Sequence, residues 1–323
     1  MPHFSLVEGE VIVAEGFMDT KKFNVNRIWK PSITPINEAL FTKEELQVYN
    51  QMQNNRPVQV LLACGPFTPN NELSYDALKD IVSVVVREQP QAMILSGPFV
   101  SHHNEDVASG DLRYREPETG ELKFLTYDDL LAEIMILIKK QLGKDPKTKI
   151  VIIPSTNEIS HIYPLPQPPM HEQFQGYNLE QMKTTLMPNP ATFTINGISI
   201  GFINTDVLKD MCQNIVVKNP KQEDAQQKPK NKIELVLQTL LQQKSYYPMY
   251  PSSYQTPVEW EQFRGLMFTK TPDVLITPSD LVHFIKVSLP HFSLILSYRT
   301  SKDASVSTLA RSSRVPQQDS THL

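Results

Sequence analysis

From residue 58 onward, the sequence alternates short apolar runs with longer amphipathic stretches. The runs typical of buried strands are VQVLLAC (58–64), AMILSG (92–97), KIVIIPS (149–155) and DVLITPSD (273–280). The stretches with the apolar spacing of helices are 75–89, 127–143 and 232–243. Strands that alternate with helices favour an α/β architecture with parallel strands. The segment 191–205 instead predicts a hairpin that turns at Asn196-Gly197.

The helix expected over 127–143 has the clearest end signals. It is acidic at its start, basic near its end, and followed by Gly143 as a stop. Its apolar residues go almost all the way round, so we expect it to be buried on all sides. A shorter helix is expected near 42–53, with Thr42 as its N-cap. The runs HFSLILSYR and SVSTLAR near the C-terminus predict closing strands.

The first thirty residues predict only β-structure. EGEVIVAEGF and KKFNVNRIW alternate apolar and polar residues and are separated by a turn at 18–21. Two or three strands do not make a stable domain alone, so they must pack on other structure. We therefore divide the chain into a small β element (1–35), a linker with a short helix (36–56), an α/β domain (57–310) and a disordered tail (311–323). Within the α/β domain, the charged segment 218–231 predicts a disordered loop.

Composition excludes several classes of protein. The formal net charge of -4 gives no general attraction to nucleic acid. The two cysteines, Cys64 and Cys212, are too few for a disulfide framework, which suits a reducing compartment. No apolar run reaches the roughly 18 residues of a membrane helix, and the N-terminus has no signal pattern. We expect a soluble protein that does not contact a membrane.

The ends of the predicted strands are where an α/β protein places its ligand. Here they read Cys64-Gly65-Pro66-Phe67, Ser96-Gly97-Pro98-Phe99, Pro154-Ser155-Thr156-Asn157 and Pro278-Ser279-Asp280. All four carry a proline, which offers no side-chain ligand, and only the last carries a carboxylate. A two-metal hydrolase needs several converging carboxylates and histidines. The prolines at these strand ends therefore constrain the backbone but supply no charged ligands. We assign no catalytic, cofactor-binding or metal-binding residue.

A few polar residues near these ends have two interpretations. His102, His103 and Asp106 in SHHNED, and His161 in STNEISH, could be metal ligands, but a solvated polar loop explains SHHNED equally well. Asp280 and His283 have the spacing of a turn followed by a helix, which favours Asp280 as an N-cap. Two further residues have structural interpretations: Asp206 as the cap of a short helix, and Cys64 as a small buried residue rather than a reactive thiol.

Two segments are unusually rich in aromatic residues and proline. SYYPMYPSSYQTPVEW (245–260) predicts either an aromatic lid over the core or a protein-binding surface. YPLPQPPM (163–170) has the same two interpretations, with a polyproline ligand as a third. The sequence alone does not choose between them.

A family resemblance rests on six motifs in order: ACGPFTPNNELSYDAL, PQAMILSGPFV, VIIPSTNEISHIYPLPQPP, NPATFTINGISIGFINTDVL, LLQQKSYYPMYP and PDVLITPSDLVHFIKV. Calcineurin-like phosphoesterases carry Asp-x-His, Gly-Asp, Gly-Asn-His and Gly-His-x-His at successive strand ends, where this chain has the four sequences given above. Over roughly residues 57–287 it resembles the inactivated phosphoesterase domain of the B subunits of the eukaryotic replicative DNA polymerases. Among them it is most similar to those of polymerase alpha–primase.

The resemblance implies a fold and a role. The fold is a two-sheet, phosphoesterase-like α/β sandwich flanked by helices, preceded by the closing strands of a truncated OB-fold at 1–35. The role is that of a non-catalytic accessory subunit in the initiation of DNA replication in the nucleus. Its implied partners are the C-terminal domain of the polymerase alpha catalytic subunit and, through the complex, the primase subunits. The resemblance implies no cofactor and only weak or indirect DNA contact.

Two other functions compete with this one. An active metallophosphoesterase would need His102, Asp106, His161, Asp280 and His283 to converge, and would bind manganese, iron or zinc. A single-stranded nucleic-acid binder would need a basic groove with stacking aromatic residues near the N-terminus. The candidates there are Phe17, Phe23, Trp29, Lys21, Lys22, Arg27 and Lys30.

Overall fold

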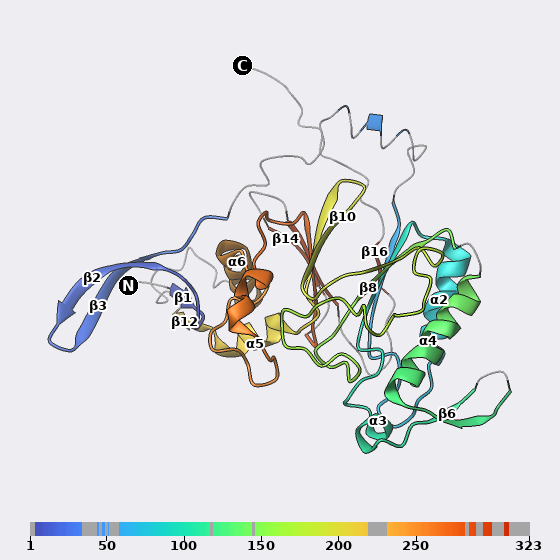
Figure 1. Cartoon of the computed structure of the whole chain (residues 1–323). Coiled ribbons are helices and arrows are strands. Elements are labelled where there is room, and N and C mark those ends of the chain that lie inside the picture. Colours follow the sequence, from blue (N-terminus) through green and yellow to red (C-terminus); the bar gives the residue numbers. More distant parts are fainter. Residues whose placement is uncertain are drawn as a thin grey trace. The chain divides into compact units, whose positions relative to one another are not determined.

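The computed structural model divides the chain into two compact units. Unit 1 comprises residues 1–40, 153–170 and 187–301, and unit 2 comprises residues 41–152, 171–186 and 302–323. Apart from the isolated residues Glu44, Gln47, Val48 and Gln51, the structure describes residues 4–33, 58–116, 119–143, 146–218, 231–281, 284–288, 293–298 and 307–309. Figure 1 shows the elements in order along the chain.

Unit 2 is built on a five-stranded sheet in the order β16-β4-β5-β8-β9. Its strands are β4 (Val60–Cys64), β5 (Ala92–Ser96), β8 (Lys149–Ile153), β9 (Thr184–Leu186) and β16 (Ser307–Leu309). The β4–β5 and β8–β9 pairs are parallel, as the alternating pattern predicted, and β16 is antiparallel to β4. Every residue of β4 and β5 is buried. Continuous burial of this kind is typical of central strands of an α/β sheet.

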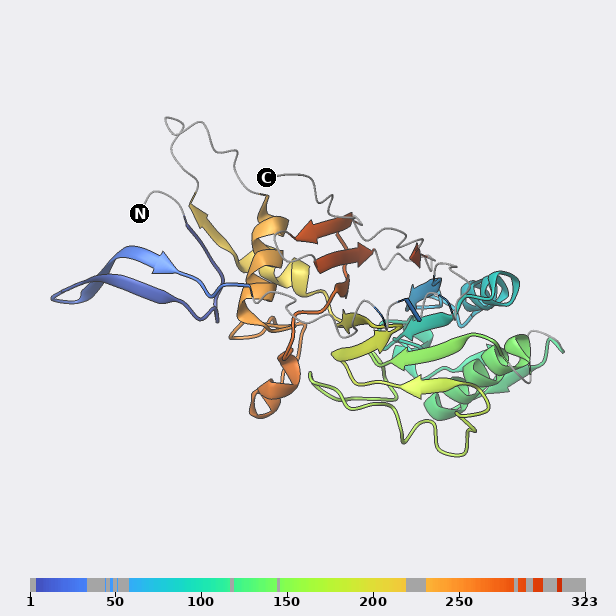
Figure 2. The same ribbon diagram turned by 90° about the horizontal axis from the view of Figure 1, so that it is seen from above.

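Helices α2 (Asp76–Glu88) and α4 (Tyr127–Leu142) lie side by side on one face of this sheet (Figure 2). Thr126 and Asp129 form a capping box at the start of α4, which satisfies two backbone donors there. The prediction that α4 is buried all round was wrong, because Ile136 is 49% exposed. A helix that covers the outside of a sheet keeps one side toward solvent, and α4 has apolar residues even on that side. The short α3 (Glu105–Ser109) and the hairpin of β6 (Arg113–Arg115) and β7 (Leu122–Phe124) complete unit 2.

Unit 1 has its own five-stranded sheet, in the order β10-β11-β13-β15-β14. Its strands are β10 (Ala191–Ile195), β11 (Ile198–Phe202), β13 (Val274–Pro278), β14 (Phe284–Ser288) and β15 (Ser293–Tyr298). The β10–β11 hairpin is confirmed, and Asn196 and Gly197 both have positive φ at its turn. Strands β11, β13 and β15 are parallel neighbours, while β14 returns antiparallel to β15.

Helices α5 (Val207–Asn214) and α6 (Lys232–Gln243) supply most of the core of unit 1. Their apolar side chains cluster with Leu275 of β13 and with Tyr246, Tyr247 and Phe268. The helix predicted over 232–243 is confirmed, because α6 has these bounds. Strand β1 (Phe4–Leu6) pairs with β12 (Val216–Lys218), so Lys218, the first residue of the predicted loop 218–231, belongs to a strand instead. Residues 219–230 lie outside the described part.

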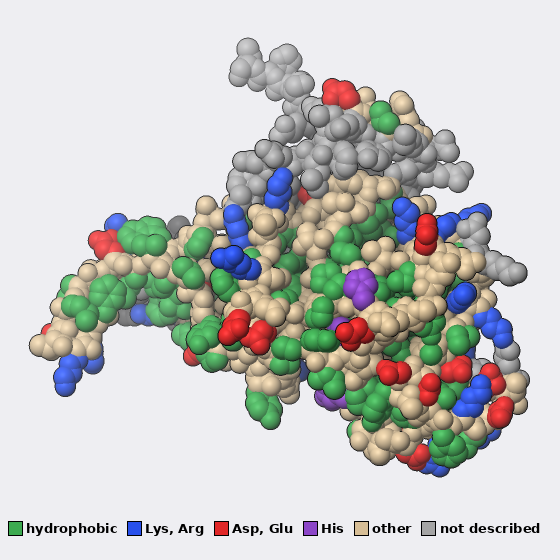
Figure 3. All heavy atoms as spheres, in the orientation of Figure 1, with side chains coloured by type: hydrophobic (Ala, Val, Ile, Leu, Met, Phe, Trp, Pro, Cys, Tyr) green, Lys and Arg blue, Asp and Glu red, His purple; other side chains and the backbone are tan. Residues whose placement is uncertain are grey.

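A two-stranded ribbon of β2 (Val13–Asp19) and β3 (Lys22–Trp29) extends away from the sheet of unit 1 (Figure 1). At its base, the Gln243 side chain donates to the Val11 carbonyl at 2.9 Å and accepts from the Val11 amide at 3.0 Å. Lys30 forms an ion pair with Glu10 at 2.6 Å. Apolar side chains gather along the ribbon in Figure 3. Phe17 of β2 is 59% exposed and Met18 of the same strand is 74% exposed.

Two of the predicted segments fall mostly or entirely on residues that the structure does not describe. The helix near 42–53 and the tail from 311 lie largely or wholly outside the described residues, although Glu44, Gln47, Val48 and Gln51 are helical. The described residues contain no helix of a length and apolarity that would let it cross a bilayer. The mixed α/β class is confirmed. The described elements form separate small sheets rather than a barrel.

Candidate functional site at the strand ends

In unit 2, the two Gly-Pro-Phe sequences close the carboxyl ends of β4 and β5. The Gly65 amide donates to the Ser96 carbonyl at 2.9 Å. A Cβ atom on Gly65 would lie 2.1 Å from the carbonyl oxygen of Pro98, so only glycine fits here. The rings of Phe67 and Phe99 lie 5.6 Å apart, and each residue is 1% exposed. An aromatic pair therefore fills the carboxyl ends of two neighbouring parallel strands, where α/β proteins commonly bind a ligand.

Cys64 belongs to the same closed edge. Its thiol donates to the Gly97 carbonyl at 3.6 Å, and the residue is buried. A thiol in this position has no access to a substrate, which agrees with its interpretation as a small core residue.

The segment SHHNED is anchored by Asn104, which is 2% exposed. The Asn104 side chain accepts from the amides of Asp106 and Val107 at the start of α3, and donates to the carbonyls of Pro69 and Glu72. The interpretation as a solvated polar loop therefore fits His102, His103 and Glu105, which are exposed, but not the buried Asn104. Asn104 ties the turn after β4 to the start of α3, and its role as an N-cap was the missed signal.

His102 and His103 lie against each other in this segment, with ring centroids 4.0 Å apart. Burial, and then the neighbouring His102, lowers the pKa of His103. Asp106 lies in the first turn of α3. His102 and His103 thus lie in the turn before the N-cap Asn104, and Asp106 belongs to the start of α3.

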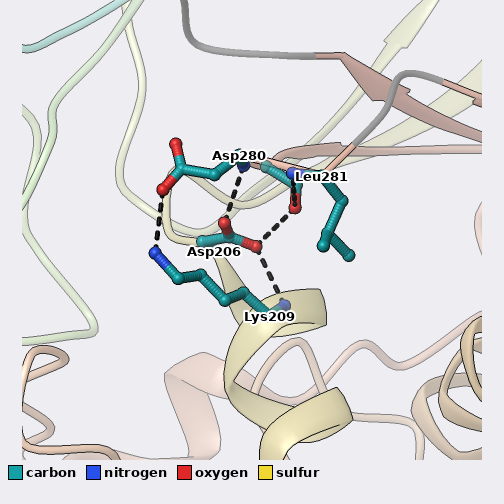
Figure 4. Close-up of polar contacts among 5 residues, drawn as sticks. Asp206, Lys209, Asp280 and Leu281 are labelled. Atoms are coloured by element: carbon teal, nitrogen blue, oxygen red, sulfur yellow. Dashed lines mark hydrogen bonds and ion pairs between the residues drawn. The ribbon is translucent and has the colours of Figure 1, made fainter.

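In unit 1, the strand ends are held by a carboxylate (Figure 4). Asp206 caps α5 as predicted, accepting from the Lys209 amide at 3.0 Å. It also accepts from the Ser279 hydroxyl at 2.6 Å and the Asp280 amide at 2.8 Å, both just after β13. The Lys209 ammonium reaches the Asp280 carboxylate at 2.9 Å. One side chain thus joins the start of α5 to the end of β13.

Burial raises the pKa of Asp206, while its hydrogen bonds from Ser279, Asp280 and Lys209 oppose that rise. The Asp280 carboxylate nearby adds to the increase. The prediction that Asp280 is an N-cap was wrong, because strand β14 begins at Phe284 and no helix follows Asp280 in the described residues. His283 lies outside them.

A second hydrogen-bonded network in unit 1 consists of amide side chains. Asn189 donates to the Gln167 side chain at 2.8 Å and accepts from the Asn204 amide at 2.8 Å. Gln167 donates to the Ser155 carbonyl, and Asn204 donates to the Pro154 carbonyl. Asn189 and Gln167 are at most 1% exposed. Sequence reasoning missed these residues, since isolated Asn and Gln give no periodic signal.

His161 also has a structural partner, since its Nε2 lies 2.8 Å from the Pro168 carbonyl. Among the residues that the structure describes, no group of three or more His, Cys, Asp or Glu side chains is placed to hold a metal ion. The described candidate ligands His102, Asp106, His161 and Asp280 are therefore not gathered into one metal centre.

The aromatic segment 245–260 splits between core and surface. Tyr246 and Tyr247 are buried, and burial raises the pKa of both, that of Tyr246 to about 12. The Tyr247 hydroxyl and the Thr256 hydroxyl each donate to buried Asp210 at 2.9 Å. Tyr250 and Tyr254 are instead exposed. The segment thus contributes its first tyrosines to the core and its later ones to the exposed surface.

The register of the β2–β3 ribbon bears on nucleic-acid binding. Glu15 lies opposite Arg27, and Asp19 lies opposite Lys22. Residues directly opposite share a face of the ribbon, so each cation faces a carboxylate. Lys30 is paired with Glu10. Of the cations proposed for a basic groove, three therefore face acids, which does not favour that function.

With the geometry of the strand ends described, comparison with known proteins identifies the family of this chain. A family model for the B subunit of DNA polymerase alpha/epsilon matches residues 60–286, more than half of the chain, so the chain belongs to this family.

The curated relatives are B subunits of DNA polymerase alpha by name. The chain is 27% identical over 294 residues to the protein of Bos taurus, a match that covers 90% of this chain and 43% of that protein. It is 28% identical over 284 residues to the protein of Dictyostelium discoideum (87% and 39%). It is 26% identical over 318 residues to that of Saccharomyces cerevisiae (86% and 42%). The chain thus spans less than half the length of these relatives.

Proposed function

We propose that this chain is a non-catalytic accessory subunit of the DNA polymerase alpha–primase complex. In this role it binds the C-terminal domain of the catalytic subunit, and through the complex it associates with primase. It acts in the nucleus at the initiation of DNA replication. The names of its relatives support the polymerase alpha assignment.

The proposal that this subunit is non-catalytic rests on the residues at the strand ends. In unit 2 they are filled by Phe67 and Phe99. In unit 1 the Asp206 carboxylate already accepts three hydrogen bonds from the protein itself. A two-metal phosphoesterase instead needs carboxylates and histidines whose lone pairs point at the ions.

We further propose that the two sheets form the phosphoesterase-like sandwich of the family, and that β2 and β3 are closing strands of an OB-fold. The register of the β2–β3 ribbon supports the proposal that these strands belong to an OB-fold. One face of the ribbon carries only apolar residues and glycine: Ala14, Gly16, Met18, Phe23, Val25 and Ile28. A two-stranded ribbon is marginal alone, and an apolar face requires a cover.

The deciding experiment is co-expression of this chain with the C-terminal domain of the polymerase alpha catalytic subunit, followed by size-exclusion chromatography. We expect one peak with one copy of each protein. The corresponding domain of the polymerase epsilon catalytic subunit is the matched control, because the family model covers both polymerases. Equal binding of both domains would contradict the alpha assignment, and binding of neither would contradict the scaffold role.

Elemental analysis and phosphodiester hydrolysis by the same purified chain test the catalytic alternative. We expect metal far below one ion per chain and no hydrolysis above buffer with manganese, iron or zinc added. Stoichiometric metal together with turnover would overturn the non-catalytic proposal.

A further inference from the structure

A groove in unit 2 lies apart from the strand ends. It has a volume of about 210 Å³. Its lining consists of Lys79 on α2, Tyr114 on β6, Glu116 just after β6, and Glu133, Ile136, Leu137, Lys140 and Gln141 of α4. We call it the Tyr114 groove. Acidic and basic side chains are interspersed on this part of the surface (Figure 3).

Two polar groups in the Tyr114 groove lack hydrogen-bond partners among the described residues. Tyr114 is only 4% exposed, and its hydroxyl bonds to none of their side chains or backbone groups. The Gln141 Oε1 atom is buried and accepts no hydrogen bond from them. Buried polar atoms are nearly always hydrogen-bonded in native proteins, so the buried Gln141 Oε1 calls for a ligand or water that donates to it, and the Tyr114 hydroxyl lines the same groove.

The two carboxylates of the groove are bound to different extents. Glu116 accepts from the Thr119 hydroxyl at 2.7 Å, lies 3.3 Å from the Lys123 Nζ and is also attracted by Lys140, whereas among the described residues Glu133 has only the Lys123 Nζ, at 3.6 Å. Good charge-assisted hydrogen bonds measure about 2.7–2.9 Å, so the two Lys123 contacts are loose. Lys123 is 32% exposed and can turn to solvent. Burial, then the charges of Glu133, Glu116 and Asp76, raises the pKa of Tyr114 to about 12.

We propose that the Tyr114 groove binds an arginine side chain of a partner polypeptide. A guanidinium presents five donors in a planar fork, which matches two carboxylates, an amide oxygen and a phenolic oxygen. Its methylene stem can pack on Ile136 and Leu137, which are apolar and line the same groove.

The remaining cations of the groove do not favour an anion instead. Lys79 is already paired with Asp76 at 2.5 Å. Lys140 is exposed, and an acidic ligand beside it would face Glu116 and Glu133 as well. A lysine ligand offers three donors from one point and would repeat the contact that Lys123 already makes. The groove therefore selects arginine by its acceptors.

The test is saturation-transfer NMR on the full chain with N-acetyl-arginine amide as the probe. The citrulline analogue has nearly the same shape without the charge, and the lysine and glutamate analogues vary the head group. We expect the arginine probe to bind at least about tenfold more tightly than the other three. Equal binding of citrulline, lysine or glutamate would overturn the proposal.

Two variants locate the binding within the groove. Glu133→Gln removes one carboxylate charge, and Tyr114→Phe removes only the hydroxyl; each should weaken arginine binding by about three- to tenfold. Glu180→Gln, an exposed acid of unit 2 outside the groove, is the control and should bind as the wild type does. Thermal unfolding of each variant establishes that it is folded. Folded groove variants with unchanged arginine binding would overturn the site.

Discussion

The two units close the carboxyl ends of their sheets with opposite chemistry. Unit 2 uses packing: Gly65 lies against the backbone of Pro98, and the buried rings of Phe67 and Phe99 adjoin. Unit 1 uses hydrogen bonds: Asp206 joins α5 to β13, and Asn189 joins Gln167 to Asn204. The comparison teaches that a sheet edge able to hold a catalytic site can be made structural in two ways, by filling it or by satisfying its polar groups internally.

The packed edge should be the more sensitive to truncation. We expect Phe99→Ala to lower the free energy of unfolding by about 3–5 kcal/mol, because it removes a fully buried ring and leaves a cavity. Urea denaturation followed by circular dichroism measures this. The matched control is Phe124→Ala, whose ring is 76% exposed on β7 and whose loss should cost less than about 0.5 kcal/mol. Similar losses in both variants would mean that the aromatic pair does not stabilise the strand ends.

Adding a single carbon should also disturb the packed edge. Gly65→Ala places a Cβ atom 2.1 Å from a backbone oxygen, so the backbone must shift, at a cost of about 3 kcal/mol. Gly110→Ala is the control for conformation alone, because Gly110 has the left-handed α conformation (φ +75°, ψ 11°) and open space around it. It should cost about 1 kcal/mol. A smaller loss for Gly65→Ala than for Gly110→Ala would contradict the close approach.

These two edges also differ in how far the sequence predicts them. The strands, the helices α2, α4 and α6 and the hairpin at Asn196-Gly197 follow from periodicity and turn residues, which act locally. The prolines and apolar residues at the strand ends could also be identified from the sequence, because they directly follow the predicted strands. The Phe67–Phe99 contact was not, since it joins residues about thirty positions apart.

The polar edge was harder to predict. Asp206 as a helix cap is a local signal and was confirmed, but its bonds to Ser279 and Asp280 span more than seventy residues. Asp280 was misassigned because its spacing from β13 suits either a helix or a strand. Tertiary pairing of β14 with β15 decides that choice, and no window of sequence contains it.

The polar edge should depend on one side chain. We expect Asp206→Asn to cost about 2 kcal/mol near neutral pH, because the amide cannot accept all three hydrogen bonds and points a donor at another donor. Chemical denaturation measures the loss. Asp106→Asn, in the first turn of α3, is the matched control and should cost less. Equal costs would mean that the Asp206 network contributes no more than an ordinary helix-start acid.

The wild type and the Asp206→Asn variant should also differ in how their stability depends on pH. Burial raises the folded-state pKa of Asp206 above its unfolded value of about 3.9, so the folded state holds the proton more tightly. The resulting stability is fully present below the unfolded value and is lost as pH rises through the folded pKa. The stability of the wild type relative to Asp206→Asn should therefore fall as the pH rises from the unfolded pKa of Asp206 to its folded pKa. A relative stability that rises with pH would show that the hydrogen bonds outweigh burial.

The smallest effect should come from the ion pair beside this network. Lys209 and Asp280 are 37% and 57% exposed at their side chains, so solvent screens their attraction. We expect Lys209→Ala to cost less than about 1 kcal/mol, and less still at a salt concentration of about 1 M. The Lys209 backbone amide, which bonds Asp206, is retained in this variant. A loss near that of Asp206→Asn would mean that the polar edge is held by surface charge, whereas a small loss assigns its stability to the buried carboxylate.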